Sequence, residues 1–151
     1  MARLQPWPVG AYLVGGAVRD ALLGKQATDL DWVVAEPAAA ARALAAAVSG
    51  SVFELDAARQ HWRVTAPGGA HHDFAPLRVG ATDIETDLTL RDLTINALAL
   101  GPDGTVIDPT GGRADLAAKL VRMTSRSALL ADAVRPLRVV RFAATLGAWT
   151  A

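Results

Sequence analysis

A glycine-glycine turn between two short apolar runs constrains the fold of this chain more than any other feature. The apolar run 11–14 stops at Gly15-Gly16, and apolar residues with helical spacing follow over 17–23. Residues 30–34 then form a second run that is rich in β-forming side chains. This order predicts a strand, a glycine turn, a short helix and a second strand, all within one small unit.

The second strand carries two carboxylates, Asp29 and Asp31. Residues two apart on a strand face the same side, so the two carboxylates repel, and burial would raise their pKa values unless a cation compensates. Mg²⁺ is bound by one or two carboxylates together with substrate phosphates, and two ions about 4 Å apart can hold an attacking hydroxyl and a leaving pyrophosphate. Taken alone, an Asp-x-Asp pair is common and favours a solvated strand edge.

The glycine turn supplies the complementary half of such a site. A glycine turn that opens a helix lets backbone N–H groups approach a phosphate, and the helix dipole adds to the attraction. Arg19, one turn into the helix, can bind the same phosphates through its planar fork. Taken alone, this is a plain strand-to-helix turn, since neither the dinucleotide fingerprint nor the Walker spacing is present. The turn and the carboxylate pair together predict a site for a nucleoside triphosphate with its magnesium.

Composition limits the partners and the location. The 151 residues carry 15 basic and 15 acidic side chains, so any RNA must be held by local contacts rather than by overall charge. The absence of cysteine excludes disulfides, thiolate metal sites and cysteine nucleophiles. No apolar run approaches the roughly 20 residues of a membrane span, and residues 1–8 hold no run of signal-peptide length. We expect a soluble cytoplasmic protein without a membrane partner.

The rest of the chain alternates helical and strand patterns. Helices are expected over 37–48, 83–91, 114–119 and 135–146. Strands are expected over 52–55, 61–65, 70–77, 106–107 and 120–124, with 95–100 as a further apolar stretch. In the last helix, which starts near Arg135 because Pro136 follows, one regular face is expected to hold Leu137, Val140, Arg141 and Ala144. We predict an α/β (α+β mixed) fold with a small mixed sheet flanked by helices.

Four sequence blocks stand in a fixed order between about residues 11 and 146. They are Val14-Gly15-Gly16-Ala17-Val18-Arg19-Asp20 with Leu22-Leu23-Gly24 and Asp29-Leu30-Asp31; Arg91-Asp92-Leu93-Thr94-Ile95-Asn96-Ala97; Asp108-Pro109-Thr110-Gly111-Gly112 with Asp115-Leu116; and Arg135-Pro136-Leu137-Arg138-Val139-Val140-Arg141-Phe142. Together they resemble the head domain of class II tRNA nucleotidyltransferases and bacterial poly(A) polymerases.

This resemblance implies roles for individual residues. The metal-binding and catalytic pair corresponds to Asp29 and Asp31. The nucleotide-binding residues correspond to Gly15, Gly16, Arg19, Arg91, Asp92, Asn96, Arg135, Arg138 and Arg141. Two spacings agree with these roles: Asp92 and Asn96 are one helical turn apart and can share a ribose hydroxyl, and the last three arginines form a stripe on one helix face. Without the resemblance, a cap or turn residue for Asn96 and a solvated helix face for the arginines are the preferred explanations.

Asp73 is a third candidate catalytic carboxylate. It alternates with apolar or bulky neighbours in the expected strand, so it can point toward the same cleft, and members of the wider superfamily often use a third carboxylate there. The chain departs from the family pattern at Leu90, where the first of two arginines usually stands, and at Pro136. The second departure weakens the assignment of Arg135 more than that of the metal site.

The resemblance implies an enzyme that transfers AMP or CMP from ATP or CTP to an RNA 3′ end with Mg²⁺. Addition of CCA, or part of it, to tRNA is the preferred hypothesis. A poly(A) polymerase head and a truncated nucleotide- or RNA-binding remnant without turnover are the alternatives.

The expected domains are an N-terminal extension over 1–10, the head over 11–146 and the truncated start of a helical neck over 147–151. In this family the neck reads the base. Without it we expect poor discrimination between ATP and CTP, and self-association through an apolar face that includes part of 137–146.

Overall fold

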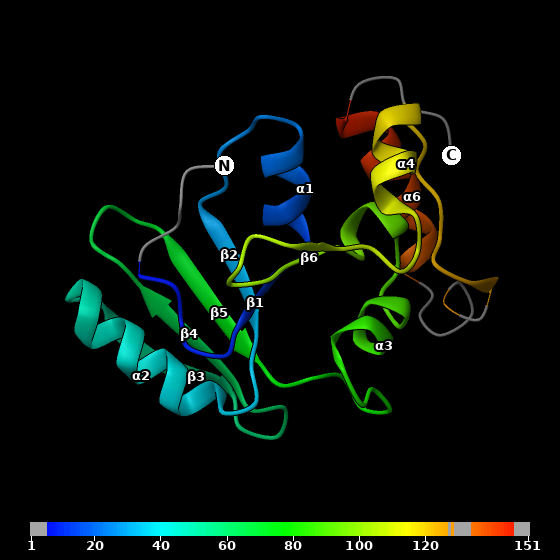
Figure 1. The fold of residues 1–151 in the computed structure, drawn as a ribbon. Coiled ribbons are helices and arrows are strands. Elements are labelled where there is room, and N and C mark those ends of the chain that lie inside the picture. The colour runs from blue at the N-terminus through cyan, green and yellow to red at the C-terminus, as the bar shows by residue number, and fades with distance from the viewer. Residues whose placement is uncertain (1–5, 127, 129–133, 147–151) are drawn as a thin grey trace.

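The computed structural model describes residues 6–126, 128 and 134–146 (Figure 1). The strands are β1 Tyr12–Val14, β2 Asp29–Val33, β3 Ser51–Asp56, β4 His61–Thr65, β5 His71–Ala75, β6 Ala99–Leu100 and β7 Val106–Ile107. The helices are α1 Gly16–Leu22, α2 Pro37–Val48, α3 Ile84–Thr89, the 3₁₀ helix η1 Thr94–Asn96, α4 Gly112–Ala118 and α6 Arg135–Thr145. None of the helices in this described part is both long and apolar enough to cross a bilayer.

All seven strands form one mixed sheet in the order β3-β4-β5-β2-β1-β6-β7. Only β2 and β5 are parallel neighbours, and the other adjacent pairs are antiparallel. The connection between β2 and β5 contains α2 and the β3–β4 hairpin, and α2 lies along that part of the sheet (Figure 1). The predicted α/β fold, with a small mixed sheet flanked by helices, is confirmed.

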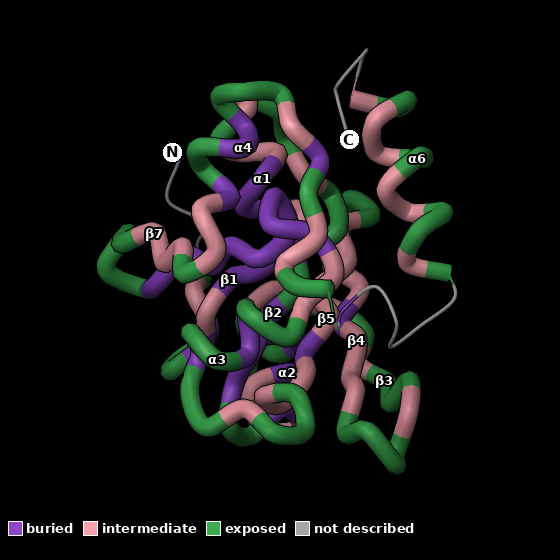
Figure 2. The backbone as a smooth tube through the Cα atoms, turned by 90° about the vertical axis from the view of Figure 1, so that its right-hand side faces the viewer, coloured by how far each residue is buried: buried purple, intermediate pink, exposed green. Residues whose placement is uncertain are grey.

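The two faces of the sheet differ because side chains alternate along β2. Leu30 and Trp32 point into the main hydrophobic core, which they share with residues of α1 and α2. Figure 2 shows this buried layer running through β1, β2 and α1. Val33 belongs to a smaller cluster with Ile84 and Leu88 of α3 on the other face. Asp29 and Asp31 lie four and two residues before Val33, so their side chains point to the same face of the sheet as Val33. The carboxylates of β2 therefore lie on the face that α3 partly covers.

The segment before β1 packs against the main core. The indole of Trp7 meets Trp32 edge-on, with ring centroids 4.9 Å apart, and its Nε1–H donates to the carbonyl of Ala11. Trp32 in turn donates from Nε1 to Nδ1 of His72 on β5. The part of the expected N-terminal extension that the structure describes therefore contributes an aromatic anchor to the domain.

Most predicted elements are confirmed, and three differ. The helix expected over 83–91 spans only Ile84–Thr89, with its start fixed by a capping box between Asp83 and Thr86. The apolar stretch 95–100 divides into η1 and β6. The strand expected over 120–124 is wrong: this segment adds no strand to the sheet, and Met123 instead forms an isolated bridge to Leu93 in the turn before η1.

Helix α6 starts at Arg135 as predicted, with Pro136 in its first turn. Its packed side is formed by Val139, Phe142, Ala143 and Leu146. Leu137 and Val140 are instead 69% and 67% exposed. The face expected from the sequence is therefore the outer one, and self-association through it stays a prediction. The expected start of the neck, 147–151, lies outside the described residues.

Candidate active site

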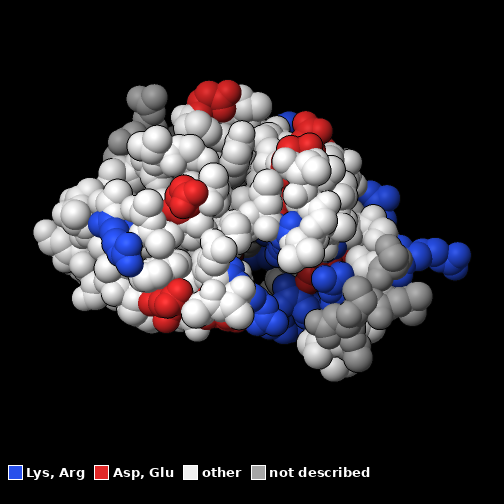
Figure 3. All heavy atoms as spheres, turned by 90° about the horizontal axis from the view of Figure 1, so that it is seen from below, with Lys and Arg blue, Asp and Glu red and all other residues white. Residues whose placement is uncertain are grey.

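The parallel pairing of β2 and β5 brings two of the candidate carboxylates together. Asp31 and Asp73 are direct partners in this ladder, so their side chains leave the sheet on the same face. Both line a cavity of about 700 Å³, together with Val14 and Arg91. Asp29 lies two residues before Asp31 on the same face and is exposed. Figure 3 views the molecule from below and shows basic side chains gathered around a hollow in this surface.

The charges around Asp31 suit a cation. Although Asp31 is accessible from the cavity, desolvation raises its pKa, and the neighbouring Asp73 and Asp29 carboxylates raise it further. Arg91 and Arg78 act in the opposite direction. A carboxylate whose ionised form is unfavourable is stabilised by a bound cation. Asp29 and Asp31 together therefore fit Mg²⁺, which needs only one or two carboxylates beside substrate phosphates. Within the described ranges, no group of three or more His, Cys, Asp or Glu side chains could by itself hold a metal.

Asp73 is held by an arginine from the neighbouring strand. Arg63 on β4 binds it bidentately, with Nε and Nη2 each 2.6 Å from a carboxylate oxygen. Both side chains are about one-third exposed, at 34% and 33%. The charge of Asp73 is thus already balanced, and its role as a third metal ligand stays a prediction.

Replacement of Asp73 tests that role. If Asp73 binds metal during turnover, Asp73→Ala should slow Mg²⁺-dependent nucleotide transfer by more than about tenfold, the effect of 1.4 kcal/mol at the transition state. Arg63→Ala is the matched control, because it removes the same ion pair and leaves the carboxylate free. An effect below tenfold for Asp73→Ala, or an equal loss in both variants, would assign Asp73 to the structure of the sheet.

The glycine turn lies against this cavity. Gly15 has φ of 73°, a conformation that favours glycine, and its N–H donates to the carbonyl of Leu98. A Cβ on Gly15 would stand 3.4 Å from Nη1 of Arg91 and 3.6 Å from Oδ2 of Asp31. The turn therefore lies next to both the cationic and the anionic parts of the site.

Arg19 has a structural role as well as its predicted one. Its Nη1 donates to Oδ1 of Asn96 at 2.6 Å, its Nε donates to Asp20, and the residue is only 9% exposed. Its guanidinium also lies 5.1 Å from the ring centre of Phe142. Arg19 therefore joins α1 to η1 and α6, and a direct contact with triphosphate stays a prediction.

Substitution of Gly16 tests phosphate binding by the turn. A Cβ there would meet Nη2 of Arg19 at an ordinary 3.5 Å, so Gly16→Ala should fold normally. It should weaken binding of ATP and CTP alike, by about tenfold, because a methyl group obstructs the backbone N–H approach to a phosphate that both nucleotides share. Calorimetric titration with each nucleotide measures this. Arg19→Ala should have the same base-independent effect with some loss of stability, and a loss for only one base would contradict the assignment.

The second block contributes Arg91, while its two other candidates contact different arginines. Asp92 accepts from the backbone N–H of Leu93 and from Nε of Arg138, whereas Asn96 accepts from Arg19. The 3₁₀ helix starts only at Thr94. The expectation that Asp92 and Asn96 lie one turn apart on a single helix is therefore wrong, and a shared ribose hydroxyl has no support from that geometry.

The three arginines of α6 do not act as one stripe. Arg135 donates to the carbonyl of Ala128, Arg138 pairs with Asp92, and Arg141 lies over the ring of Phe142. Phe142 is also the ring that Arg19 and Arg138 approach, at 5.1 and 5.7 Å. This helix is thus attached to the first two blocks by cation–π and ionic contacts, and nucleotide contact by these arginines stays a prediction.

Two residues that the sequence analysis did not single out belong to this site. Arg78 lines the same cavity as Asp31 and Arg91. Asp87 is completely buried and binds both of these arginines. Burial, followed by the nearby Arg78, lowers the pKa of Arg91, and Asp87 counteracts that shift. Asp87 and Arg91 stand four residues apart, and this helical ion-pair spacing is a signal that could have identified Asp87 from the sequence.

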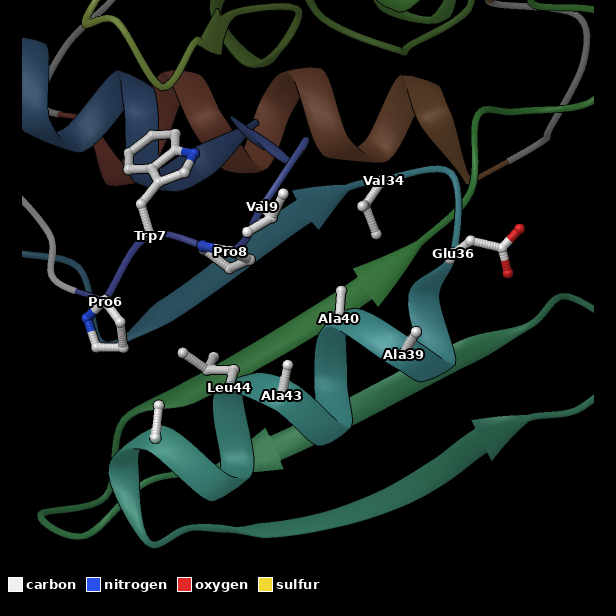
Figure 4. Close-up of a pocket in the computed structure, with 11 residues that line it drawn as sticks. Pro6, Trp7, Pro8, Val9, Val34, Glu36, Ala39, Ala40, Ala43 and Leu44 are labelled. Atoms are coloured by element: carbon white, nitrogen blue, oxygen red, sulfur yellow. The ribbon is translucent and has the colours of Figure 1, made fainter.

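A second groove, of about 330 Å³, lies away from the carboxylates (Figure 4). It is bounded by the segment Pro6 to Val9 on one side and by α2, including Ala40 and Leu44, on the other. Its lining is almost entirely apolar apart from Glu36, so it offers no groups for nucleotide chemistry.

The fold and the cavity define a nucleotidyltransferase-type domain, with strand carboxylates beside a glycine turn and an arginine. A family model described as the poly A polymerase head domain matches residues 11–122, and the chain belongs to this family. The family predicted from the four sequence blocks is thus confirmed.

Named relatives agree with this family. The chain is 50% identical over 143 residues to the A-adding tRNA nucleotidyltransferase of Deinococcus radiodurans, covering 95% of this chain and 32% of the relative. It is also 50% identical over 141 residues to the CC-adding tRNA nucleotidyltransferase of Geobacter sulfurreducens, covering 91% of this chain and 32% of that protein. The chain thus spans about a third of the length of these curated relatives.

Solved structures give the same result for the fold. A tRNA nucleotidyltransferase complexed with a primer tRNA and an incoming ATP analog superposes with a TM-score of 0.81 at 37% identity, covering 90% of this chain and 42% of that one. A tRNA-processing enzyme with CTP also has a TM-score of 0.81, at 36% identity, covering 88% and 37% of the two chains.

Proposed function

We propose that this chain is the catalytic head of a tRNA nucleotidyltransferase, which transfers CMP or AMP from CTP or ATP to the 3′ end of tRNA and releases pyrophosphate. The observation that carries the proposal is the geometry at Gly15, where a Cβ would stand 3.4 Å from Nη1 of Arg91 and 3.6 Å from Oδ2 of Asp31, two side chains that line the cavity. The names of the relatives, which include A-adding and CC-adding tRNA nucleotidyltransferases, support the choice of substrate.

Each part of the site has a proposed role. Asp29 and Asp31 hold Mg²⁺, which when bound lowers the pKa of the attacking hydroxyl and neutralises charge on the leaving group. The backbone at Gly15 and Gly16 approaches the phosphates, and Arg91, whose Nη1 lies beside the turn, neutralises their charge. This chain's own contribution is then positioning and electrostatic stabilisation, as in phosphoryl transfer generally.

The number and identity of the added bases form a separate question. The A-adding and the CC-adding relatives are equally similar to this chain, at 50% identity each. We therefore propose complete or partial CCA addition without assigning the base, and a poly(A) polymerase head stays the alternative within the same family. Because tRNA maturation in bacteria takes place in the cytoplasm, a cytoplasmic location is part of the proposal.

Transfer to defined tRNA ends tests the proposal. The protein is incubated with Mg²⁺, labelled CTP or ATP, and tRNA that lacks all or part of its CCA end, with Asp31→Ala as the negative control. Extension by one to three defined nucleotides supports tRNA end addition, and a long adenosine tail would support the poly(A) alternative. Binding of nucleotide or RNA without any transfer by the chain, alone or within a longer protein, would support the remnant without turnover.

A further inference from the structure

A fully buried carboxylate joins two arginines at the wall of the cavity. Asp87 on α3 has no exposed surface. It accepts from the backbone N–H and from Nη1 of Arg78, at 2.8 and 2.9 Å. It also accepts from Nε and Nη2 of Arg91, at 3.2 and 3.0 Å. One buried negative charge is therefore shared between two positive charges, and the group as a whole is cationic.

In each guanidinium, at least one nitrogen does not bind Asp87. Arg91 uses Nε and Nη2 for Asp87, while its Nη1 is the atom nearest to the glycine turn, 3.4 Å from where a Cβ of Gly15 would stand. Within the described part of the chain, Arg78 uses only Nη1 of its guanidinium in a hydrogen bond, and that side chain is 44% exposed. Both arginines line the cavity that also contains Asp31. The free donors thus belong to the same cavity as the proposed metal ligand.

We propose that Asp87 is a positioning residue that holds Arg78 and Arg91 as a two-arginine bracket for a polyphosphate, with Arg78 as a further phosphate-binding residue. For its natural ligand, the nucleoside triphosphate, this inference rests on the proposed function.

The physical argument has two parts. An arginine fork matches phosphate oxygens bidentately, and an arginine that is already fixed loses less side-chain entropy when it binds. A magnesium–triphosphate complex is still an anion, so a cationic bracket facing Asp31 completes the charge balance around it.

Binding of polyphosphate by the 151-residue chain tests the bracket. The variants are Arg78→Gln, which removes the more exposed arginine of the bracket, and Asp87→Asn, which keeps the size of the residue that holds both arginines but removes its negative charge. Arg42→Ala is the control, because it loses one positive charge on α2, where Arg42 lies over the ring of Trp62. Magnesium tripolyphosphate, CTP and ATP are titrated calorimetrically at a temperature at which thermal melts show each variant to be folded.

We expect Arg78→Gln to raise the Kd about tenfold for all three ligands, since one charge-assisted hydrogen-bonding group is lost. Asp87→Asn should raise the Kd at least as much, because both Arg78 and Arg91 lose their fixed position. In the double variant Arg78→Gln/Asp87→Asn, the Kd should exceed that of Asp87→Asn by no more than about twofold, because both changes act through the same bracket. Arg42→Ala should stay within about twofold of the unaltered protein.

Unchanged Kd values in Arg78→Gln would overturn the bracket, even if Asp87→Asn fails to fold. A lower melting temperature with a normal Kd in Asp87→Asn would reduce Asp87 to a stabilising residue of α3. Failure of the unaltered chain to bind tripolyphosphate would also overturn the proposal. The same experiments distinguish the bracket from the proposed function. Tripolyphosphate binding that responds to these variants without any transfer to tRNA would contradict the proposed function alone. Normal transfer by Arg78→Gln would contradict the bracket alone.

Discussion

Replacing Asp31 with asparagine is expected to reduce Mg²⁺-dependent nucleotide transfer by about a thousandfold. A metal ion supplies several kcal/mol of transition-state charge stabilisation, and each 1.4 kcal/mol corresponds to a factor of ten in rate. Single-turnover assays in a transfer-competent protein that contains this head measure the effect. Asp103→Asn is the matched control, because it neutralises an exposed carboxylate whose hydrogen bonds, within the described residues, go to the turn residue Thr105.

The same substitution should not destabilise the domain. The folded-state pKa of Asp31 is raised by desolvation and by Asp73. The ionised form is therefore less favourable in the folded than in the unfolded chain, and the domain loses stability as the pH rises from the unfolded-state pKa through the folded-state pKa. At neutral pH, Asp31→Asn removes that cost, so the melting temperature without metal should be equal or higher. Near-normal transfer, or a large fall in melting temperature, would show that Asp31 is a structural residue.

Replacing Gly112 with alanine should cause the largest loss of stability. A Cβ on Gly112 would lie 2.2 Å from the carbonyl oxygen of Thr94 and 3.2 Å from Cδ2 of Leu98. Thr94 is buried and its hydroxyl donates to Asp115 of α4, so η1 and α4 cannot separate without breaking that bond. We expect a loss of about 3 kcal/mol or more in the free energy of unfolding and a melting temperature lower by roughly 10 °C.

Gly101→Ala provides the control for this substitution. A Cβ there would approach only the end of the flexible side chain of Asp103 closely, at 2.7 Å, and that side chain can move. Its expected effect is below about 1 kcal/mol. Equal melting temperatures for the two variants in thermal denaturation would contradict the close packing of α4 against η1.

Local sequence patterns were sufficient to predict the elements that are fixed by residues close to one another in the chain. Pro37 fixes the start of α2, which ends where predicted at Val48. The alternation along β2 predicted correctly that Asp29 and Asp31 share one face. The turn at Gly15 was predicted from the glycine pair itself, and its φ of 73° agrees with that interpretation. The strand expected over 120–124 failed because its partner is a turn distant in sequence, and strand propensity carries no information about pairing.

The sequence by itself determined the family, the order of most elements and the carboxylate pair, because turn chemistry and side-chain alternation are local properties of the backbone. Only the tertiary structure decided what each arginine binds. Arg138 neutralises Asp92, Arg63 holds Asp73, and Arg78 shares Asp87 with Arg91. An arginine side chain is long and its charge is attracted to whichever carboxylate the fold brings near, so its partner depends on how strands and helices remote in sequence are brought together.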